Sequence, residues 1–432
     1  MKVVAFLPAK GSSERVENKN TKLLDGKPLF LHTLEKLMHC DFIDEVYLDS
    51  ESEEIFALAS NVNAKFLRRD RTLASNKTDG HQLFHNEAKK VSADIYIQIL
   101  CTSPFIKIET IKKGVEVLKN SSNYDSVVLM RKEKQYLWSN GQPLYDKDHI
   151  PNSIDLPDSI IETMGLYIVR KEIALSKKMR FGDNVFFLEA DATEAIDVNY
   201  PDDFILASFI AAGMREKERQ LFKNLNSLLT SSILSDILDD LGMPDNITSK
   251  LSLNLPNKKI LGRAKTLKLR RLEENEDYQG IYRALDSYAT IIPNDIIVVE
   301  NECSEFAYFG ELNANLAIRA GAVAAIIDGK TRDTKGVSDL DFPVFAKQTT
   351  CKDVRKRATV ESINKKISLC GIEVTPGDLI FGDNDGIVVI PSKYETLIIN
   401  KALETLNKEK NVLLHITTGY STDNILKNTG GF

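Results

Sequence analysis

Over residues 1–215, short apolar runs rich in β-forming residues alternate with stretches whose apolar residues recur at helical spacing. Such alternation predicts a mostly parallel sheet covered by helices on both faces. Ligands of these sheets bind beyond the carboxyl ends of the strands. The predicted strands are Val3–Leu7, Glu45–Leu48, Ile95–Leu100, Ser126–Met130 and Leu166–Val169, and the predicted helices are Leu29–Met38, Glu53–Ala59, Gln82–Val91 and Ile108–Leu118.

The loop after the first predicted strand contains small residues between cations. Glycine and serine let backbone N–H groups approach phosphate oxygens, and lysine and arginine neutralise the charge that develops on a leaving pyrophosphate. A basic surface turn is the alternative interpretation. The pattern, which runs through residues 8–15 and continues in residues 18–22, makes nucleotide handling the first hypothesis.

Size and composition indicate a two-domain protein that handles small molecules. The 432 residues exceed what one core usually organises. A charged content of 27% and a net charge of −6 argue against non-specific binding to nucleic acid. The sequence has no run of about 18 apolar residues, which a membrane span needs, and its five cysteines lack CxxC spacing. We therefore expect a cytoplasmic protein without membrane or nucleic-acid partners.

The pattern of apolar and turn-forming residues changes near residue 215. Residues 204–228 have helical character, as one helix or two, with a highly charged middle. Beyond them, Pro293-Asn294-Asp295 and Pro376-Gly377-Asp378 each precede a short apolar run, which suggests a β-rich barrel or a layered α/β domain. We expect domains at 1–215 and 229–432, joined by a helical linker at 216–228.

Further motifs follow the N-terminal loop in a fixed order: Tyr47–Ile55, Arg69 with Leu73-Ala74, Cys101–Phe105 and Glu194–Phe204. With this set, residues 1–210 resemble the CMP-sugar synthetases, cytidylyltransferases that activate sialic acids and other 2-keto-3-deoxy sugar acids with CTP. The resemblance implies a Rossmann-like nucleotidyltransferase fold and attack by the anomeric hydroxyl of the sugar acid on the α-phosphate of CTP. It also implies a divalent cation, Mg²⁺ or Mn²⁺, that helps pyrophosphate leave.

The resemblance assigns roles to individual residues of this sequence. It implies that Arg15 and Lys22 are catalytic cations, with Lys22 near the base or the α-phosphate. It implies that Asp197 and Asn199 are metal ligands. Substrate binding is implied for Lys10, Gly11, Ser12, Ser13, Asn20, Arg69, Thr102 and Ser103.

Several positions depart from the family pattern. Lys10 replaces the usual arginine and loses its bidentate fork, Ser12 replaces a glycine, and Glu14 reverses a charge near the phosphates. Asn199 replaces an aspartate and offers Mg²⁺ only a carbonyl oxygen. Leu100 replaces a glutamine of the sialic-acid members. An acceptor of pseudaminic, legionaminic or octulosonic type is therefore favoured over N-acetylneuraminate.

Two other features have ordinary structural explanations. His81 and His85 are four residues apart on a predicted helix, but no third metal ligand or general base accompanies them. We interpret them as helix-surface histidines. Trp138 could belong to a lid, and packing is the preferred interpretation.

The densest pattern of the second half covers residues 309–333. Gly310 opens a predicted helix whose free N–H groups can hold an anion, and Gly321 occupies a helix C-cap position. A buried strand then delivers Arg332 and Asp333 at its carboxyl end. A solvated ion pair on a turn is the alternative. The context favours a carboxylate held between helix and guanidinium, beside a divalent cation.

Together with Gly262–Thr266, Phe342–Ala346 and Gly371–Pro391, this pattern resembles the RraA-like family over residues 221–415. That family includes class II pyruvate aldolases for substrates of the 4-hydroxy-4-methyl-2-oxoglutarate type, and the RNase E regulator. The resemblance implies an αββα fold of the swivelling β/β/α type, a homotrimer or hexamer with sites between subunits, and Mg²⁺ or Mn²⁺ on the pyruvyl group. It implies that backbone N–H groups of Gly310, Glu311 and Leu312 bind a carboxylate, that Arg332 is catalytic and that Asp333 is a metal ligand.

The two resemblances leave three functions open. In the first, the chain is bifunctional: a pyruvate aldolase makes or salvages a 2-keto-3-deoxy acid, and the other half activates that acid with CTP. In the second, CMP transfer is the only reaction and the C-terminal domain is a regulatory or oligomerisation module. In the third, the acceptor of CMP is a phosphonate or another non-sugar compound.

Overall fold

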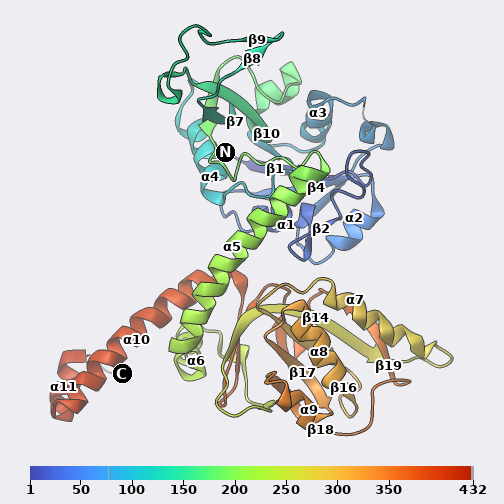
Figure 1. Cartoon of the computed structure of the whole chain (residues 1–432), viewed down its shortest axis with the longest axis vertical. Helices are drawn as coiled ribbons and strands as arrows, with labels where there is room; N and C mark the ends of the chain where they lie inside the picture. Colours follow the sequence, from blue (N-terminus) through green and yellow to red (C-terminus); the bar gives the residue numbers. More distant parts are fainter. Residues whose placement is uncertain (76, 430–432) are drawn as a thin grey trace. The chain divides into compact units, whose positions relative to one another are not determined.

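The computed structural model describes residues 1–75 and 77–429. It consists of two compact units, Met1–Ala212 and Gly213–Phe432 (Figure 1). Residues 204–228, for which one or two helices were expected, lie in a single helix, α5 (Pro201–Leu228), and the expected linker falls inside it. In the described residues, no helix has the length and apolar character needed to cross a membrane.

The first unit is built on a seven-stranded sheet in the order β11-β7-β10-β6-β1-β4-β5. All neighbours are parallel except β10, which is antiparallel to both β6 and β7. The predicted mostly parallel sheet is therefore confirmed. The strands are β1 (Val3–Pro8), β4 (Glu45–Ser50), β5 (Lys65–Arg68), β6 (Ile95–Ile99), β7 (Ser126–Glu133), β10 (Ser159–Arg170) and β11 (Val185–Glu189).

Helices cover both faces of this sheet, as the alternation predicts. In β1, Val3 and Ala5 belong to one apolar core and Val4 and Phe6 to the other, because successive side chains of a strand point to opposite faces. Helices α1 (Leu29–Met38), α2 (Glu53–Leu58) and α4 (Ile108–Asn120) contribute to the first core, and α3 (Gly80–Lys90) contributes to the second. Each buried leucine, isoleucine or phenylalanine contributes about 1.5–3 kcal/mol to these cores.

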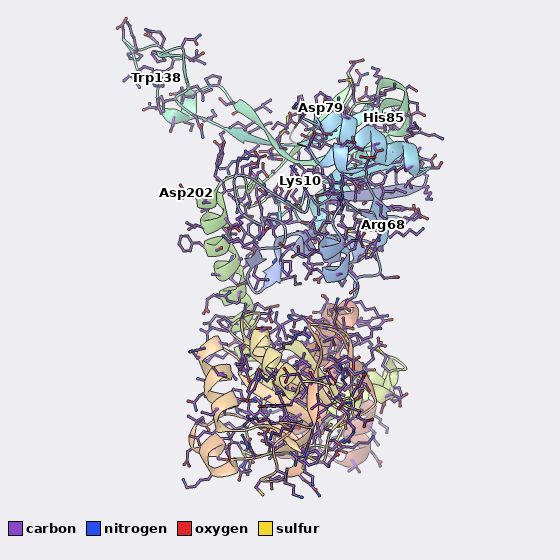
Figure 2. All side chains as sticks on the ribbon, turned by 90° about the vertical axis from the view of Figure 1, so that its right-hand side faces the viewer. Lys10, Arg68, Asp79, His85, Trp138 and Asp202 are labelled. Atoms are coloured by element: carbon purple, nitrogen blue, oxygen red, sulfur yellow. The ribbon has the colours of Figure 1, made fainter. Side chains whose placement is uncertain are left out.

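An arm extends from the ends of β7 and β10 and carries a small hairpin of β8 (Trp138–Ser139) and β9 (Gln142–Pro143). Figure 2 shows Trp138 on this arm, away from Lys10. The Trp138 side chain is 63% exposed and meets Tyr145 edge-on. The packing expected for Trp138 is therefore limited to this aromatic neighbour within the arm, and most of the side chain is exposed.

The second unit contains a ten-stranded sheet in which β14 is a central strand. The strands of this sheet follow the order β12-β23-β22-β14-β15-β17-β18-β13, with β16 beside β17 and β19 beside β14. They are β12 (Ile247–Thr248), β13 (Ser252–Leu253), β14 (Ile260–Arg271), β15 (Asp295–Asn301), β16 (Ala307–Phe309), β17 (Ala324–Thr331), β18 (Val344–Thr349), β19 (Ala358–Ile363), β22 (Leu379–Gly382) and β23 (Ile387–Ile390); β20 (Ile367–Leu369) and β21 (Ile372–Val374) form a separate hairpin.

The two predicted turns of the second unit have the same construction. The carboxylates of Asp295 and Asp378 accept the backbone N–H groups of Ile292 and Thr375, each at 2.8 Å. The strands that follow, β15 and β22, both pair with β14. Helices complete the layers and confirm the α/β class: α6 (Ser231–Asp240), α7 (Leu285–Tyr288), α8 (Glu311–Ala320), α9 (Thr334–Asp339), α10 (Glu395–Thr417) and α11 (Thr422–Thr429).

Arg263 on β14 connects α5 and α10 to the sheet. Its Nη1 and Nη2 donate to Glu395 at 2.5 and 3.0 Å, and its Nε donates to Glu218 at 3.1 Å. We expect Arg263→Leu to destabilise this unit by about 2–3 kcal/mol, because two partly buried carboxylates would then face each other without a cation.

The matched control is Arg271→Leu on the same strand. Arg271 pairs with Glu305 at 2.8 Å, but both side chains are about half exposed and screened by solvent, so we expect little or no loss of stability. Hydrogen–deuterium exchange of β14 and β22 peptides in the full chain measures both changes. Equal loss of protection in the two variants would contradict the prediction.

Candidate active sites

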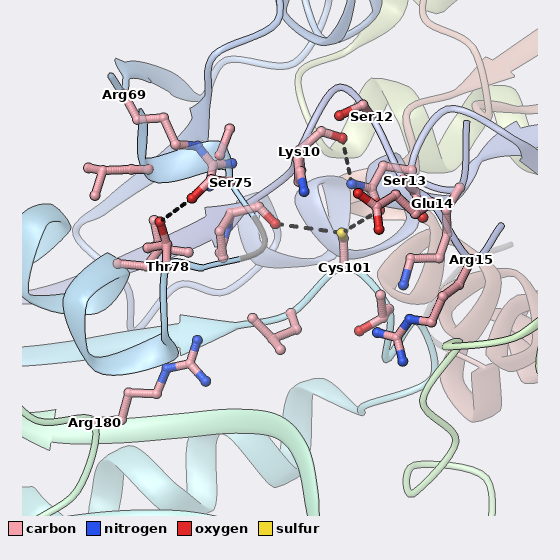
Figure 3. A pocket seen from close by; sticks show the side chains of 18 residues that line it. Lys10, Ser12, Ser13, Glu14, Arg15, Arg69, Ser75, Thr78, Cys101 and Arg180 are labelled. Atoms are coloured by element: carbon pink, nitrogen blue, oxygen red, sulfur yellow. Dashed lines mark hydrogen bonds between the residues drawn. The ribbon is translucent and has the colours of Figure 1, made fainter. Parts of the chain in front are cut away.

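A cavity of about 570 Å³ opens at the carboxyl ends of β1, β5 and β6 (Figure 3). This is the edge of the sheet at which a ligand was expected. The cavity is lined by Pro8, Lys10, Ser12, Ser13, Glu14, Arg15, Lys19, Asn20, Arg69, Leu73, Ala74, Ser75, Thr78, Leu83, Leu100, Cys101, Thr102 and Arg180.

Most of the residues predicted to bind substrate or to be catalytic in the first unit line this cavity. Three of them, Gly11, Lys22 and Ser103, are not among its lining residues. Gly11 donates its N–H to Glu51 Oε1 at 2.7 Å, and a Cβ at this position would lie 2.6 Å from that of Ser52. Lys22 places its Nζ 4.7 Å from the centre of the Phe204 ring. Ser103 is buried in the turn after β6. The predicted site residues that do line the cavity are Lys10, Ser12, Ser13, Arg15, Asn20, Arg69 and Thr102.

Asn20 fixes the shape of the loop through two hydrogen bonds. Its Nδ2 donates to the Lys10 carbonyl at 2.7 Å, and its Oδ1 accepts the Cys101 thiol at 3.2 Å. Burial raises the pKa of the Cys101 thiol to about 11, so the sulfur keeps the proton that it donates. The buried Asn20 therefore ties the loop after β1 to the loop after β6.

Arg69 is held by acidic residues that the sequence analysis did not single out. Its Nε lies 3.3 Å from Glu51 Oε2 and 3.5 Å from Asp49 Oδ2, and its Nη2 donates to the Asp49 carbonyl at 2.9 Å. The side chains of Arg69 and Asp49 are 3% and 0% exposed. This guanidinium is consequently neutralised within the protein before any ligand arrives.

Glu87 on α3 is fully buried beside Asp49. Its Oε2 accepts Gln98 Nε2 at 2.5 Å. Burial raises the pKa of Glu87 well above its ordinary value, and the Asp49 charge raises it further. The buried site next to Asp49 therefore favours the protonated form of Glu87.

We expect Glu87→Gln to flatten the pH dependence of stability in the first unit. A carboxyl whose folded pKa is raised binds more protons folded than unfolded, so its contribution is complete below its unfolded pKa and is lost as pH rises through the folded pKa. Hydrogen exchange of α3 and β6 peptides at pH 5 and pH 8 tests this. The wild type should lose more protection at pH 8 than the variant, and exposed Glu116→Gln should behave like the wild type.

The predicted metal ligands lie with Arg15 and Lys19. Arg15 Nη2 donates to Asn199 Oδ1 at 3.0 Å, and Asn199 Nδ2 donates to Asp197 Oδ2 at 2.5 Å. Lys19 Nζ donates to the Val198 carbonyl at 2.8 Å, and burial lowers the pKa of Lys19. Within the described residues, Asp197 Oδ1 is buried and has no hydrogen-bond partner, so this oxygen could accept a cation.

In the second unit, a cavity of about 380 Å³ holds four of the predicted residues: Gly310, Leu312, Arg332 and Asp333. Arg332 Nη2 lies 2.9 Å from Asp353 Oδ2, a partner that no sequence pattern indicated. The N–H of Glu311, at the start of α8, faces Asp333 Oδ2 at 3.4 Å. A Cβ on Gly310 would lie 2.5 Å from the same oxygen, so glycine permits this approach.

Metal ligands in both cavities are few. Across residues 1–75 and 77–429, no three or more His, Cys, Asp or Glu side chains gather in a group that could hold a metal ion. Asp333 and Asp353 line the second cavity. Among the described residues, no aspartate lines the first cavity, and its predicted ligands Asp197 and Asn199 are connected by hydrogen bonds to the lining residue Arg15. Such a set fits Mg²⁺, which usually binds one or two protein carboxylates and takes its other ligands from water and substrate phosphates.

Comparison with known proteins assigns the two units separately. A cytidylyltransferase family profile matches residues 4–172, and an Aldolase/RraA profile matches residues 231–389. A putative 4-hydroxy-4-methyl-2-oxoglutarate aldolase of Halalkalibacterium halodurans is 31% identical over 40% of this chain and 78% of the relative. An N-acylneuraminate cytidylyltransferase of Escherichia coli is 26% identical over 52% of this chain and 56% of the relative.

A CMP-N,N′-diacetyllegionaminic acid synthase of Legionella pneumophila is 33% identical over 28% of this chain and 54% of the relative. The chain thus spans about half the length of these two sugar-acid relatives. Among solved structures, a CMP-2-keto-3-deoxy-manno-octonic acid synthetase with CTP has a TM-score of 0.38 at 18% identity, covering 50% of this chain and all of that one. RraAS2 of Streptomyces coelicolor has a TM-score of 0.40 at 23% identity, covering 44% and 94%. The first unit matches the cytidylyltransferase profile, and the 31% identity over 78% of the aldolase relative shows that the chain belongs to the RraA-like family through its second unit.

Proposed function

We propose that the first unit transfers CMP from CTP to a 2-keto-3-deoxy sugar acid of nonulosonic or octulosonic type and releases pyrophosphate. The observation that carries this proposal is the cavity at the strand ends, where Lys10, Arg15 and Lys19 gather. Three cations on one wall match the charge of a triphosphate. The small residues Ser12 and Ser13 lie between them on the same loop.

In the proposed reaction, the anomeric oxygen forms a bond to the α-phosphorus while the bond to the pyrophosphate oxygen breaks. Lys10 and Arg15 stabilise the charge that accumulates on pyrophosphate. Asp197 and Asn199 are the residues that would hold Mg²⁺ or Mn²⁺, which supplies further positive charge to the phosphates when bound. Arg15 orients Asn199 through the hydrogen bond between them.

Part of the cavity wall, where we place the body of the acceptor, is aliphatic. Leu73, Leu83 and Leu100 all line it. An aliphatic wall favours a deoxygenated or otherwise less hydrated sugar acid over N-acetylneuraminate. The proposed acceptors are therefore acids of the pseudaminic, legionaminic or octulosonic type.

For the second unit we propose a metal-dependent pyruvate aldolase or lyase reaction. Cleavage of the bond between C3 and C4 of a 4-hydroxy-2-keto acid releases an aldehyde, and protonation of the remaining enolate gives pyruvate. Arg332 would hold the enolate oxygen, and Asp333 would hold the cation. The open cavity around Arg332 supports this reading over a purely regulatory module. We also propose assembly as a homotrimer or hexamer through this domain, in the cytoplasm.

The full-length chain tests both proposals in one panel. Pyrophosphate release from CTP is measured with N,N′-diacetyllegionaminate, pseudaminate, 2-keto-3-deoxy-manno-octonate and a phosphonate. Pyruvate release is measured from the same keto acids with and without Mg²⁺. Pyrophosphate release with the phosphonate alone would replace the sugar-acid proposal, and absence of pyruvate from every acid would leave the regulatory module as the function of the second unit.

A further inference from the structure

Arg180 is a buried cation in the wall of the N-terminal cavity, and no role proposed above uses it. It follows the π-helical turn η3 (Ile173–Lys177) and precedes β11. The residue is only 7% exposed, and its Nε has no hydrogen-bond partner in the part of the chain that the structure describes. Figure 3 shows its guanidinium reaching toward the cavity from the wall opposite Lys10.

The surrounding residues fix Arg180 in this position. Its guanidinium lies 5.0 Å from the centre of the Tyr167 ring. Its backbone N–H donates to His81 Nδ1 at 3.0 Å, and the His81 ring meets Phe181 edge-on. His85 Nδ1 lies 3.0 Å from the Ala174 carbonyl. The two histidines of α3 therefore hold the segment that carries Arg180, and are not free surface residues.

Gly80 makes room for the guanidinium. A Cβ at Gly80 would lie 2.2 Å from the guanidinium carbon of Arg180. Gly80 is the first residue of α3, so the cation lies against the start of an eleven-residue helix. The start of a helix carries partial positive charge, which repels a cation and attracts an anion.

The nearby carboxylates have other partners. Asp183 pairs with Lys177, Glu162 accepts the Tyr167 hydroxyl, and Asp79 caps α3 by accepting the Gln82 N–H at 2.9 Å. Contact with an aromatic face offsets only part of the cost of burying a guanidinium. The cavity is therefore the direction from which Arg180 can gain an anionic partner.

We infer that Arg180 and the first turn of α3 recognise the carboxylate of the CMP acceptor. This inference rests on the proposed cytidylyl transfer, which brings two anions into the cavity. Lys10 and Arg15 lie on the loop after β1 and serve the triphosphate, whereas Arg180 approaches from the opposite wall. A guanidinium matches a carboxylate through two parallel N–H···O bonds.

The experiment uses full-length wild type, Arg180→Gln and Arg180→Lys, with exposed Lys178→Gln as the control in the same segment. Binding of N,N′-diacetyllegionaminate, pseudaminate, 2-keto-3-deoxy-manno-octonate and their methyl esters is measured by calorimetry, and KM values by pyrophosphate release. We expect Arg180→Gln to weaken binding of the free acid about 10- to 100-fold and to leave the ester unchanged. The KM for CTP should change less than about twofold, which also shows that the variant is folded, and Arg180→Lys should recover part of the affinity.

Each outcome separates the two claims. A parallel rise in the KM for CTP, or an unchanged preference for acid over ester, overturns the assignment of Arg180 while cytidylyl transfer stands. Binding of the acid that depends on Arg180 but yields no pyrophosphate overturns the transfer reaction and supports the anion site. Failure of the wild type to bind any of the acids overturns both.

Discussion

The Asp197→Asn variant is expected to lose about 100- to 1,000-fold in the rate of cytidylyl transfer at a fixed Mg²⁺ concentration. One oxygen of the carboxylate accepts a hydrogen bond from Asn199, and the other is buried and has no partner among residues 1–75 and 77–429. Asparagine keeps the size of the side chain but removes the negative charge that would attract the cation. The rate is measured as pyrophosphate release over a series of Mg²⁺ concentrations.

Two further variants sharpen this prediction. Asp202→Asn, at an exposed position on the first turn of α5, should leave the rate nearly unchanged. Asn199→Asp supplies the second carboxylate of the family pattern and should lower the Mg²⁺ concentration needed for half-maximal rate. If Asp197→Asn keeps the wild-type rate and the wild-type Mg²⁺ dependence, Asp197 is not a metal ligand.

Arg332→Ala is expected to reduce pyruvate release by about 100-fold or more, with pyrophosphate release unchanged. Arg332 lies between Asp333 at 3.7 Å and Asp353 at 2.9 Å, so the two carboxylates hold its guanidinium at the cavity wall. Arg332→Lys keeps the charge but loses the planar fork, and should restore little activity. Pyruvate is measured by its reduction with a coupled dehydrogenase.

The control is Arg319→Ala, at an exposed position near the end of α8. It should release pyruvate at the wild-type rate. A wild type that releases pyruvate, with Arg332→Ala equally active, would place the aldol chemistry elsewhere. Altered subunit assembly in Arg332→Ala, without any aldol activity in the wild type, would favour the regulatory module.

The sequence predicts most of the first sheet because its buried strands and amphipathic helices have regular apolar spacing. Helix α1 matches its predicted bounds, Leu29–Met38. Strand β5 was not predicted, because three of its four residues are exposed and no alternation marks it. The pairing of β10 with β7 shifts its register between Glu162 and Tyr167, and Met164 between them has a φ of 60°. Only Leu166–Val169, in the part of β10 near its C-terminal end, was predicted as a strand.

The candidate sites were predictable where neighbouring residues in the chain share a loop. The cations of the first loop and the pair Arg332-Asp333 are of this kind. Glu87 and Asp49, which lie together beside Arg69, come from distant segments, and so does Arg180 in the cavity wall; only the folded chain brings these residues to the site. No local pattern distinguishes such residues from surface charges. The same limit applies to His81 and His85, which were predicted to lie on a helix surface. Their partners, the backbone N–H of Arg180 and the carbonyl of Ala174, are about 90 to 100 residues away in the sequence and could not be predicted from it.

The antiparallel direction of β10 has a consequence for how this protein can diversify. Because β7 leaves the sheet and β10 enters it at the edge where the cavity opens, the intervening arm begins and ends at that edge. The arm can gain, lose or exchange residues without shifting the register of any strand, since its two ends stay paired to each other. New residues at the rim can therefore arise at little risk to folding, while the loop after β1 stays under the tighter constraint of the central strands.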